Sequence, residues 1–155
     1  MSKVEDFLTS SEEKEVVEAI RLAEKNTSGE IRVHIEKGTS LKGELANQAS
    51  IAPLERAVEV FHELKMDATQ ERNSVIIYIA AKSKQFAIYG DKGINDKVND
   101  DFWNSTKDIM LQYFKKGENK LALIKGIENA GEQLKKYFPY HSDDIDELSN
   151  EISKG

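Results

Sequence analysis

The residues best suited to chemistry in this chain are carboxylate and amide side chains in two separate loops. Asp67 and Asn73 precede the apolar segment 75–81, and Asp91 and Asp96 follow the apolar segment 85–90. Oxygen atoms of such side chains are the ligands that Ca²⁺ and Mg²⁺ prefer in proteins. A shared cation site therefore requires a fold that brings the two loops together.

The two apolar segments predict such a fold. Segment 75–81 is continuous and rich in β-branched residues, which is typical of a strand buried on both faces. Residues 82–84 form a connection short enough for a hairpin, so segments 75–81 and 85–90 should pair antiparallel. The loop before the first strand and the loop after the second then lie at the same end of the sheet.

A third predicted strand begins at this same end of the sheet. Residues 30–36 alternate between polar and apolar side chains, which predicts a strand with one covered face. Residues 54–64 have helical periodicity and connect this strand to segment 75–81, giving a βαβ unit with parallel strands. Glu30, at the start of the strand, joins the predicted metal ligands, which are Asp67, Asp91, Asn73, Asp96 and Glu30.

The remaining segments predict helices that pack on the sheet. Ser10 and Glu13 have the spacing of a capping box before an amphipathic helix. Residues 103–113 and 123–138 each carry an apolar helical face, and Asn95 or Asp96 is expected to cap the first of them. We expect an α/β domain with a small mixed sheet and helices on both faces, an N-terminal arm at 1–9, one domain at 10–139 and an acidic, flexible tail at 140–155.

Composition excludes several classes of function. A net charge of −6 argues against nucleic acid and anionic membrane surfaces as partners. No apolar segment approaches the ~20 residues that span a bilayer, and the first residues lack the features of a signal peptide, so a cytoplasmic monomer is expected. The absence of cysteine excludes a thiol nucleophile and cysteine-bound zinc.

The acidic loops permit three interpretations. The loop after Asp91 lacks EF-hand spacing, so a cation site must combine several loops. Asp96 and its neighbours could instead simply cap the following helix. Arg72 beside these carboxylates could contact a phosphoryl group, as in a metal-assisted phosphatase, or could form a structural ion pair with one of them.

Four segments, in order, resemble the TPM domain family, which is named after thylakoid lumen phosphatase-like, photosystem II repair and acetylcholine-receptor modulator proteins. These segments are 28–33, 61–66, 69–80 and 87–95. The resemblance implies a three-layer α/β/α sandwich with a twisted mixed sheet of about four strands and four to five helices. It also implies a divalent-cation site, commonly for calcium, in a cleft formed by the loops of Asp67, Arg72–Asn73 and Gly90–Asp91.

The favoured hypothesis is an accessory or interaction domain that binds Ca²⁺ or Mg²⁺, with another protein as a possible partner. It is favoured over catalysis because no nucleophile or general base accompanies the carboxylates. The alternatives are a metal-assisted acid-type phosphatase acting on phosphomonoesters, and a protein-binding module that uses the acidic tail.

Overall fold

The computed structural model describes residues 7–37, 52–69, 71–82, 84–99, 101–140 and 150–154. Four strands form one mixed sheet in the order β3-β2-β1-β4. They are β1 (Glu30–Glu36), β2 (Ser74–Ala80), β3 (Gln85–Gly90) and β4 (Ser153–Lys154).

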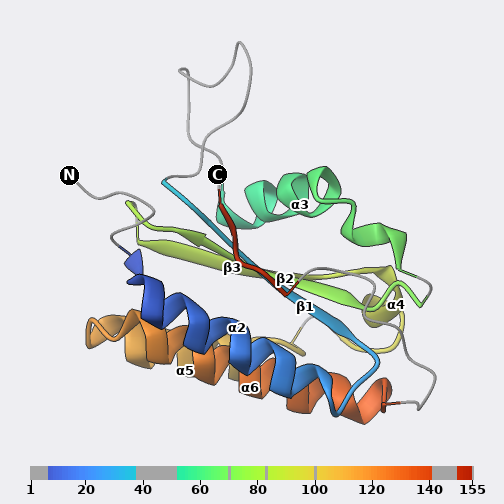
Figure 1. Ribbon diagram of the computed structural model, residues 1–155. Coiled ribbons are helices and arrows are strands. Elements are labelled where there is room, and N and C mark those ends of the chain that lie inside the picture. The colour runs from blue at the N-terminus through green and yellow to red at the C-terminus, as the bar shows by residue number, and fades with distance from the viewer. Residues whose placement is uncertain are drawn as a thin grey trace.

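Helices cover both faces of this sheet, so the fold is the predicted three-layer α/β/α sandwich (Figure 1). One face carries α2 (Ser10–Glu24), α5 (Asn104–Lys115) and α6 (Asn119–Tyr137), and the other carries α3 (Pro53–Glu63). The short helix α4 (Lys92–Asn95) and the 3₁₀ helix η2 (Met66–Ala68) lie at one end of the sheet. No helix within the described ranges is both long and apolar enough to cross a membrane.

Strand pairing confirms the predicted geometry. β1 and β2 are parallel over their whole length, with Glu30 opposite Ser74. β2 and β3 are antiparallel, with Val75 opposite Gly90. The starts of β1 and β2 and the end of β3 therefore lie at one end of the sheet, next to α4.

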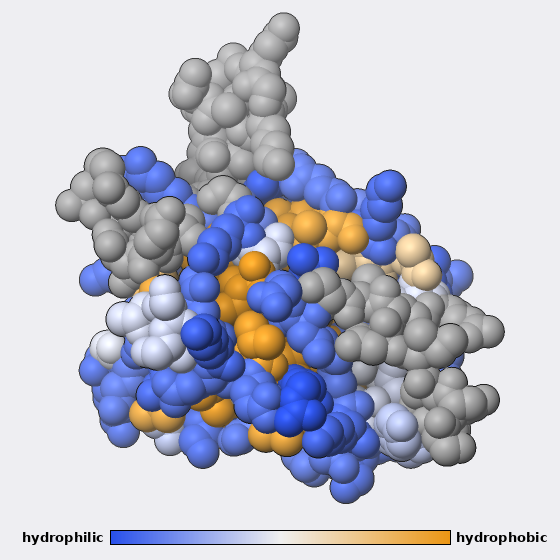
Figure 2. All heavy atoms as spheres, in the orientation of Figure 1, coloured by the Kyte–Doolittle hydropathy of each residue, from blue (hydrophilic) through white to orange (hydrophobic). Residues whose placement is uncertain are grey.

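The core has two unequal halves, one on each side of the sheet. The larger half lies between the sheet and the α2, α5 and α6 layer, and the smaller half lies under α3. β2 is buried throughout, as predicted, because it lies between two strands and between both helical layers. Figure 2 shows apolar side chains in the layer between α2 and α3, flanked by hydrophilic helix surfaces.

Two predictions about helix starts are wrong. Thr9, rather than Ser10, caps α2, and it forms a complete capping box with Glu12 at 3.1 and 2.9 Å. Both patterns were present in the sequence, and they differ by one residue. Asn95 and Asp96 do not cap the next long helix, because Asp91 caps the short α4 and α5 begins only at Asn104.

The predicted tail also needs correction at its end. Ser153–Lys154 form β4 and pair in parallel with His34–Ile35 of β1. Lys154 forms an ion pair with Glu13 of α2 at 2.6 Å, and Ile152 packs against the larger core. Residues 141–149 and 155 of the predicted tail lie outside the described residues.

Candidate functional site

The acidic loops meet at the end of the sheet next to α4, which we call the α4 rim and define by residues 66–69, 71–74 and 90–96. Backbone bonds hold its parts together, since Asp91 N donates to Ser74 O at 2.9 Å and Glu30 N donates to Asn73 O at 3.4 Å. Ser74 Oγ donates to Met66 O at 2.7 Å and thereby fixes η2 against the start of β2. Asp67 and Asp91 accordingly lie at the same end of the sheet.

An ion pair between Arg72 and Asp91 dominates the α4 rim. Arg72 Nε donates to Asp91 Oδ2 at 2.7 Å, and Nη2 donates to Oδ1 at 2.9 Å. The Asp91 side chain is 2% exposed, whereas that of Arg72 is 43% exposed. Hydrogen bonding to Asp91 raises the pKa of Arg72 against the opposing effect of desolvation, and the charges of Asp91 and Asp67 raise it further.

Local backbone geometry sets up this pair. Arg72 has a φ of 52°, a left-handed conformation that is uncommon for a residue with a side chain. Gly93 N donates to Arg72 O at 2.8 Å, and a Cβ on Gly93 would lie 2.5 Å from that oxygen. Only glycine permits α4 to approach the Arg72 loop this closely.

Asp67 and Asn73 occupy different environments within the α4 rim. The Asp67 side chain is 41% exposed, with one carboxylate oxygen 3.7 Å from Nδ1 of His62. Asn73 is buried, and its Nδ2 donates to Ser28 Oγ at 3.3 Å and Glu71 Oε2 at 3.4 Å. Asp67 thus has access to solvent, whereas the amide of Asn73 already has partners.

The two remaining predicted ligands, Glu30 and Asp96, differ from each other in burial. Glu30 is buried at the first residue of β1. Asp96 is an exposed residue at the end of α4, and its backbone N donates to Lys92 O at 2.9 Å. Within the described residues, no hydrogen bond or ion pair joins Asp96 to Arg72 or to the Asp91 side chain.

As the structure describes them, the side-chain oxygens of the predicted metal ligands do not form a preformed cation site. Asp91 Oδ1 also accepts from Lys92 N at 2.7 Å, so both carboxylate oxygens are engaged. In the part of the chain that the structure describes, no group of three or more histidine, cysteine, aspartate or glutamate side chains is positioned to hold a metal. A cation at Asp91 would have to compete with the guanidinium of Arg72.

One further polar group of the α4 rim lacks a partner. The hydroxyl of Thr69 is buried, and Oγ1 has no hydrogen-bond partner among the described residues. Thr69 O accepts from Arg72 N at 3.3 Å, so this residue belongs to the turn that carries Arg72. An unsatisfied buried hydroxyl has a free-energy cost, which a ligand oxygen or a cation could reduce.

A second polar cluster lies under α3 and was not predicted. Glu36 accepts from Arg56 at 2.7 and 2.9 Å and from Tyr78 Oη at 2.6 Å. His34 Nε2 lies 2.9 Å from Glu36 Oε1, and His34 Nδ1 lies 3.0 Å from Ser153 Oγ of β4. The alternation of residues 30–36 predicted a strand with one covered face, and it placed His34 and Glu36 on the polar face.

The residues of this cluster shift one another's pKa values. Burial raises the pKa of Glu36, but hydrogen bonds from His34, Arg56 and Tyr78 outweigh it and lower the pKa to about 2. Burial and the bond to Glu36 raise the pKa of Tyr78. Because Arg56 and Glu36 are both almost fully buried, the cluster joins α3 to the sheet by charge as well as by packing.

The fold and the α4 rim define a class of small α/β/α sandwich domain in which an arginine–aspartate pair closes an acidic end of the sheet. The TPM domain model matches residues 1–133, and the chain belongs to this family. The chain is also similar to the BA42 protein of the psychrophilic bacterium Bizionia argentinensis, whose NMR structure is known. The identity is 56%, both chains are covered completely, and the TM-score is 0.86. No curated protein matches the chain.

Proposed function

We propose that this TPM domain is an accessory or interaction domain that binds a divalent cation, Ca²⁺ or Mg²⁺, at the α4 rim. The observation that carries the proposal is that Asp91 pairs with Arg72 through both carboxylate oxygens, while Asp67 is close enough for its charge also to raise the pKa of Arg72. Arg72 supplies the positive charge that an ion would otherwise supply. Family membership adds support, because TPM domains are phosphatase-like or interaction domains.

In this proposal Arg72 acts as an internal competitor of the cation. Its side chain is 43% exposed and can reach solvent without crossing the core. When Arg72 leaves Asp91, two carboxylates and the hydroxyl of Thr69 become available to a hard cation, which requires oxygen ligands. The competition predicts weak binding, since each bound ion must displace a bidentate ion pair.

Calcium titration followed by amide NMR tests this proposal. We expect millimolar Ca²⁺ to shift the amides around Asp67, Arg72 and Asp91. Asp91→Asn should abolish these shifts, whereas Asp108→Asn, which removes an exposed carboxylate from α5, should leave them unchanged. Unshifted spectra at millimolar Ca²⁺ and Mg²⁺ would contradict the proposal.

The variant Arg72→Ala distinguishes a competing role of Arg72 from a structural one. Removing the competing guanidinium should tighten Ca²⁺ binding by roughly tenfold, which corresponds to about 1.4 kcal/mol. If Arg72 only stabilises the folded rim, the same change should weaken or abolish binding. Comparing the affinities of Arg72→Ala and Asp108→Asn with that of the natural chain decides between these roles.

Phosphomonoester hydrolysis is a second candidate function, and the half-exposed guanidinium of Arg72 favours it. A partly exposed arginine between carboxylates could contact a phosphoryl group while a metal ion is held beside it. The assay is hydrolysis of p-nitrophenyl phosphate with and without Mg²⁺. Arg72→Ala should abolish hydrolysis if Arg72 binds phosphate, whereas metal-independent hydrolysis or full activity in this variant excludes catalysis by the rim.

A further inference from the structure

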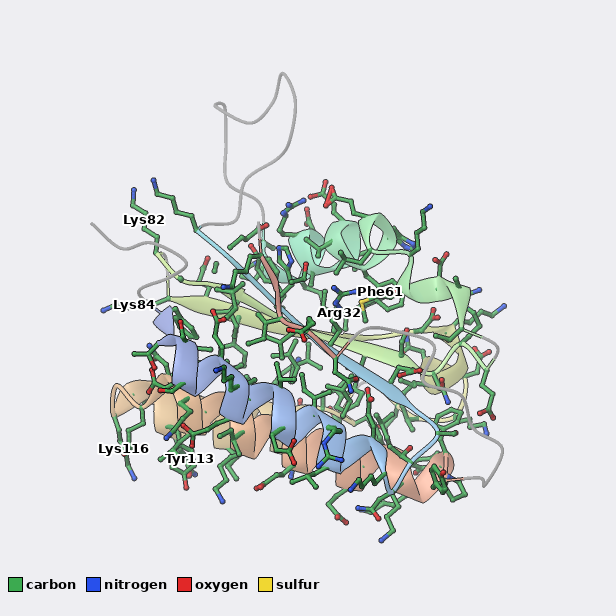
Figure 3. All side chains as sticks on the ribbon, in the orientation of Figure 1. Arg32, Phe61, Lys82, Lys84, Tyr113 and Lys116 are labelled. Atoms are coloured by element: carbon green, nitrogen blue, oxygen red, sulfur yellow. The ribbon has the colours of Figure 1, made fainter. Side chains whose placement is uncertain are left out.

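At the end of the sheet opposite α4, three loops enclose a small aromatic pocket. Its lining comes from Phe7 before α2, from the β2–β3 hairpin and from the α5–α6 turn, and its volume is about 270 Å³. The lining residues that carry the argument are Phe7, Ile79, Lys84, Phe86, Phe114 and Asn119. Figure 3 shows Lys82, Lys84 and Lys116 at this end of the molecule, far from α4.

Three phenylalanine rings form the apolar part of the pocket. The rings of Phe86 and Phe114 are 5.3 Å apart and tilted by 44°, and those of Phe7 and Phe114 are 6.1 Å apart and tilted by 50°. All three side chains pack against the larger core but are only partly buried. A further ring in an offset or edge-to-face arrangement with these side chains would gain more than an aliphatic chain that buries the same area.

The charged lining of the pocket is positive. Lys84 is a lining residue, and no lining residue is acidic. In the described part of the chain, no carboxylate pairs with Lys84 or with Lys82. Lys84 is exposed and has a φ of 56°, so the hairpin places a lysine where glycine or asparagine is more usual.

The size of the pocket limits its ligand. Pockets for drug-sized ligands measure roughly 300–1000 Å³, so a volume of about 270 Å³ suits a smaller molecule. An apolar ring against the exposed edges of the phenylalanines with an anionic group beside the lysine satisfies both features of the lining. Asn119 is a polar lining residue, and its Nδ2 donates to Phe7 O at 3.3 Å, which joins the α5–α6 turn to the segment before α2.

We propose that this pocket binds a small aromatic carboxylate of one or two rings, with its ring against Phe86 and Phe114 and its carboxylate paired with Lys84. The site is separate from the α4 rim and needs no metal. It does not depend on the function proposed for that rim.

The probe is 2-naphthoate, titrated into the full chain and followed by amide and aromatic NMR. A ligand of this size in a small pocket should bind in the high-micromolar to millimolar range. We expect shifts at Phe7, Ile79, Phe86 and Phe114 and none at Asp67 or Asp91. The absence of shifts around the pocket at saturating probe would overturn the proposal.

Two comparisons test the chemistry of recognition. The neutral analogue 2-naphthamide should bind about three- to tenfold more weakly, because it lacks the charge that pairs with Lys84. Hexanoate should also bind more weakly, because it has no ring to place against the phenylalanines. Equal affinity for either analogue contradicts the proposed ligand class.

A matched pair of variants tests the role of Lys84. Lys84→Gln keeps the length of the side chain and should weaken binding of 2-naphthoate by the same three- to tenfold, without weakening 2-naphthamide. Lys82→Gln removes a neighbouring positive charge that does not line the pocket and should leave both affinities unchanged. Because both lysines are exposed, neither change should perturb folding. Equal losses in the two variants would show a general charge effect and contradict a specific pair.

Discussion

At the scale of single residues, Glu36 is a buried carboxylate whose pKa folding lowers strongly. Its pKa falls to about 2 because Arg56, Tyr78 and His34 all stabilise the charged form against the cost of burial. A carboxylate with a lowered pKa in the folded state stabilises that state above its unfolded pKa, and the contribution is lost as the pH falls toward the folded pKa. The expected window is therefore from about pH 4.5 down to about pH 2.

The size of this effect is testable. Ionised Glu36 should contribute roughly 3 kcal/mol to the free energy of unfolding above this window. Between pH 4.5 and pH 2, the unfolding free energy of Glu36→Gln should fall by about 3 kcal/mol less than that of the natural chain. Glu55→Gln, which changes an exposed residue of α3, should keep the slope of the natural chain.

Direct titration gives an independent measurement. Carboxyl carbon NMR of the natural chain should show Glu36 still ionised at pH 3. A midpoint at or above pH 4 would mean that the hydrogen bonds of Arg56 and Tyr78 do not outweigh burial. The prediction would then be wrong even if Glu36→Gln proved unstable.

At the scale of elements, the contact of α4 with the Arg72 loop depends on one glycine. A Cβ on Gly93 would lie 2.2 Å from Glu71 O and 2.5 Å from Arg72 O, and both are backbone atoms. Gly93→Ala must therefore move either the helix or the loop, and overpacking of this kind costs about 1–3 kcal/mol. Urea unfolding at neutral pH measures the loss. Lys92→Ala, an exposed change in the same helix, should stay within about 0.5 kcal/mol of the natural chain.

The elements differ in how well the sequence predicts them. β1, β2 and β3 were predicted within a residue or two, because long apolar periodicity and a short hairpin constrain their pairing. β4 could not be predicted, because two polar residues in an acidic segment carry no hydrophobic signal and are held by β1, by Glu13 and by the packing of Ile152.

The sequence also predicts the candidate site only in part. Topology alone brings Asp67, Asn73 and Asp91 to one end of the sheet, and the sequence was sufficient for that step. The bidentate pairing of Asp91 with Arg72 depends on the left-handed backbone of Arg72, which local sequence does not specify. The partners of Glu36 were missed because strand alternation predicts one covered face and does not show that α3 buries the second face of β1.

At the scale of the whole molecule, the two ends of the sheet differ in their chemistry. The α4 rim carries Asp67, Asp91 and Arg72, whereas the opposite end carries the aromatic pocket with Lys84. The sheet holds these two ends apart, and β2 runs between them while buried on both faces. The two proposed sites can therefore be tested in one chain by ligands that do not compete.

The unequal halves of the core lead to the last prediction, which concerns local stability. α3 buries only Ala57, Val60 and Phe61 as apolar residues, whereas α6 buries five, which are Ala122, Leu123, Ile127, Ala130 and Leu134. Since opening free energy increases with buried apolar contact, α3 should open before the rest of the fold. Native-state hydrogen exchange at neutral pH should give lower opening free energies for the amides of α3 than for those of β2 and α6. Glu36→Gln should lower the values for α3 further, because Arg56 then loses its buried charged partner and keeps only the half-exposed Glu59 and Glu63, and should leave the ranking of β2 and α6 unchanged. Equal protection of α3 and α6 in the natural chain would show that the Glu36–Arg56 pair compensates for the smaller apolar contact.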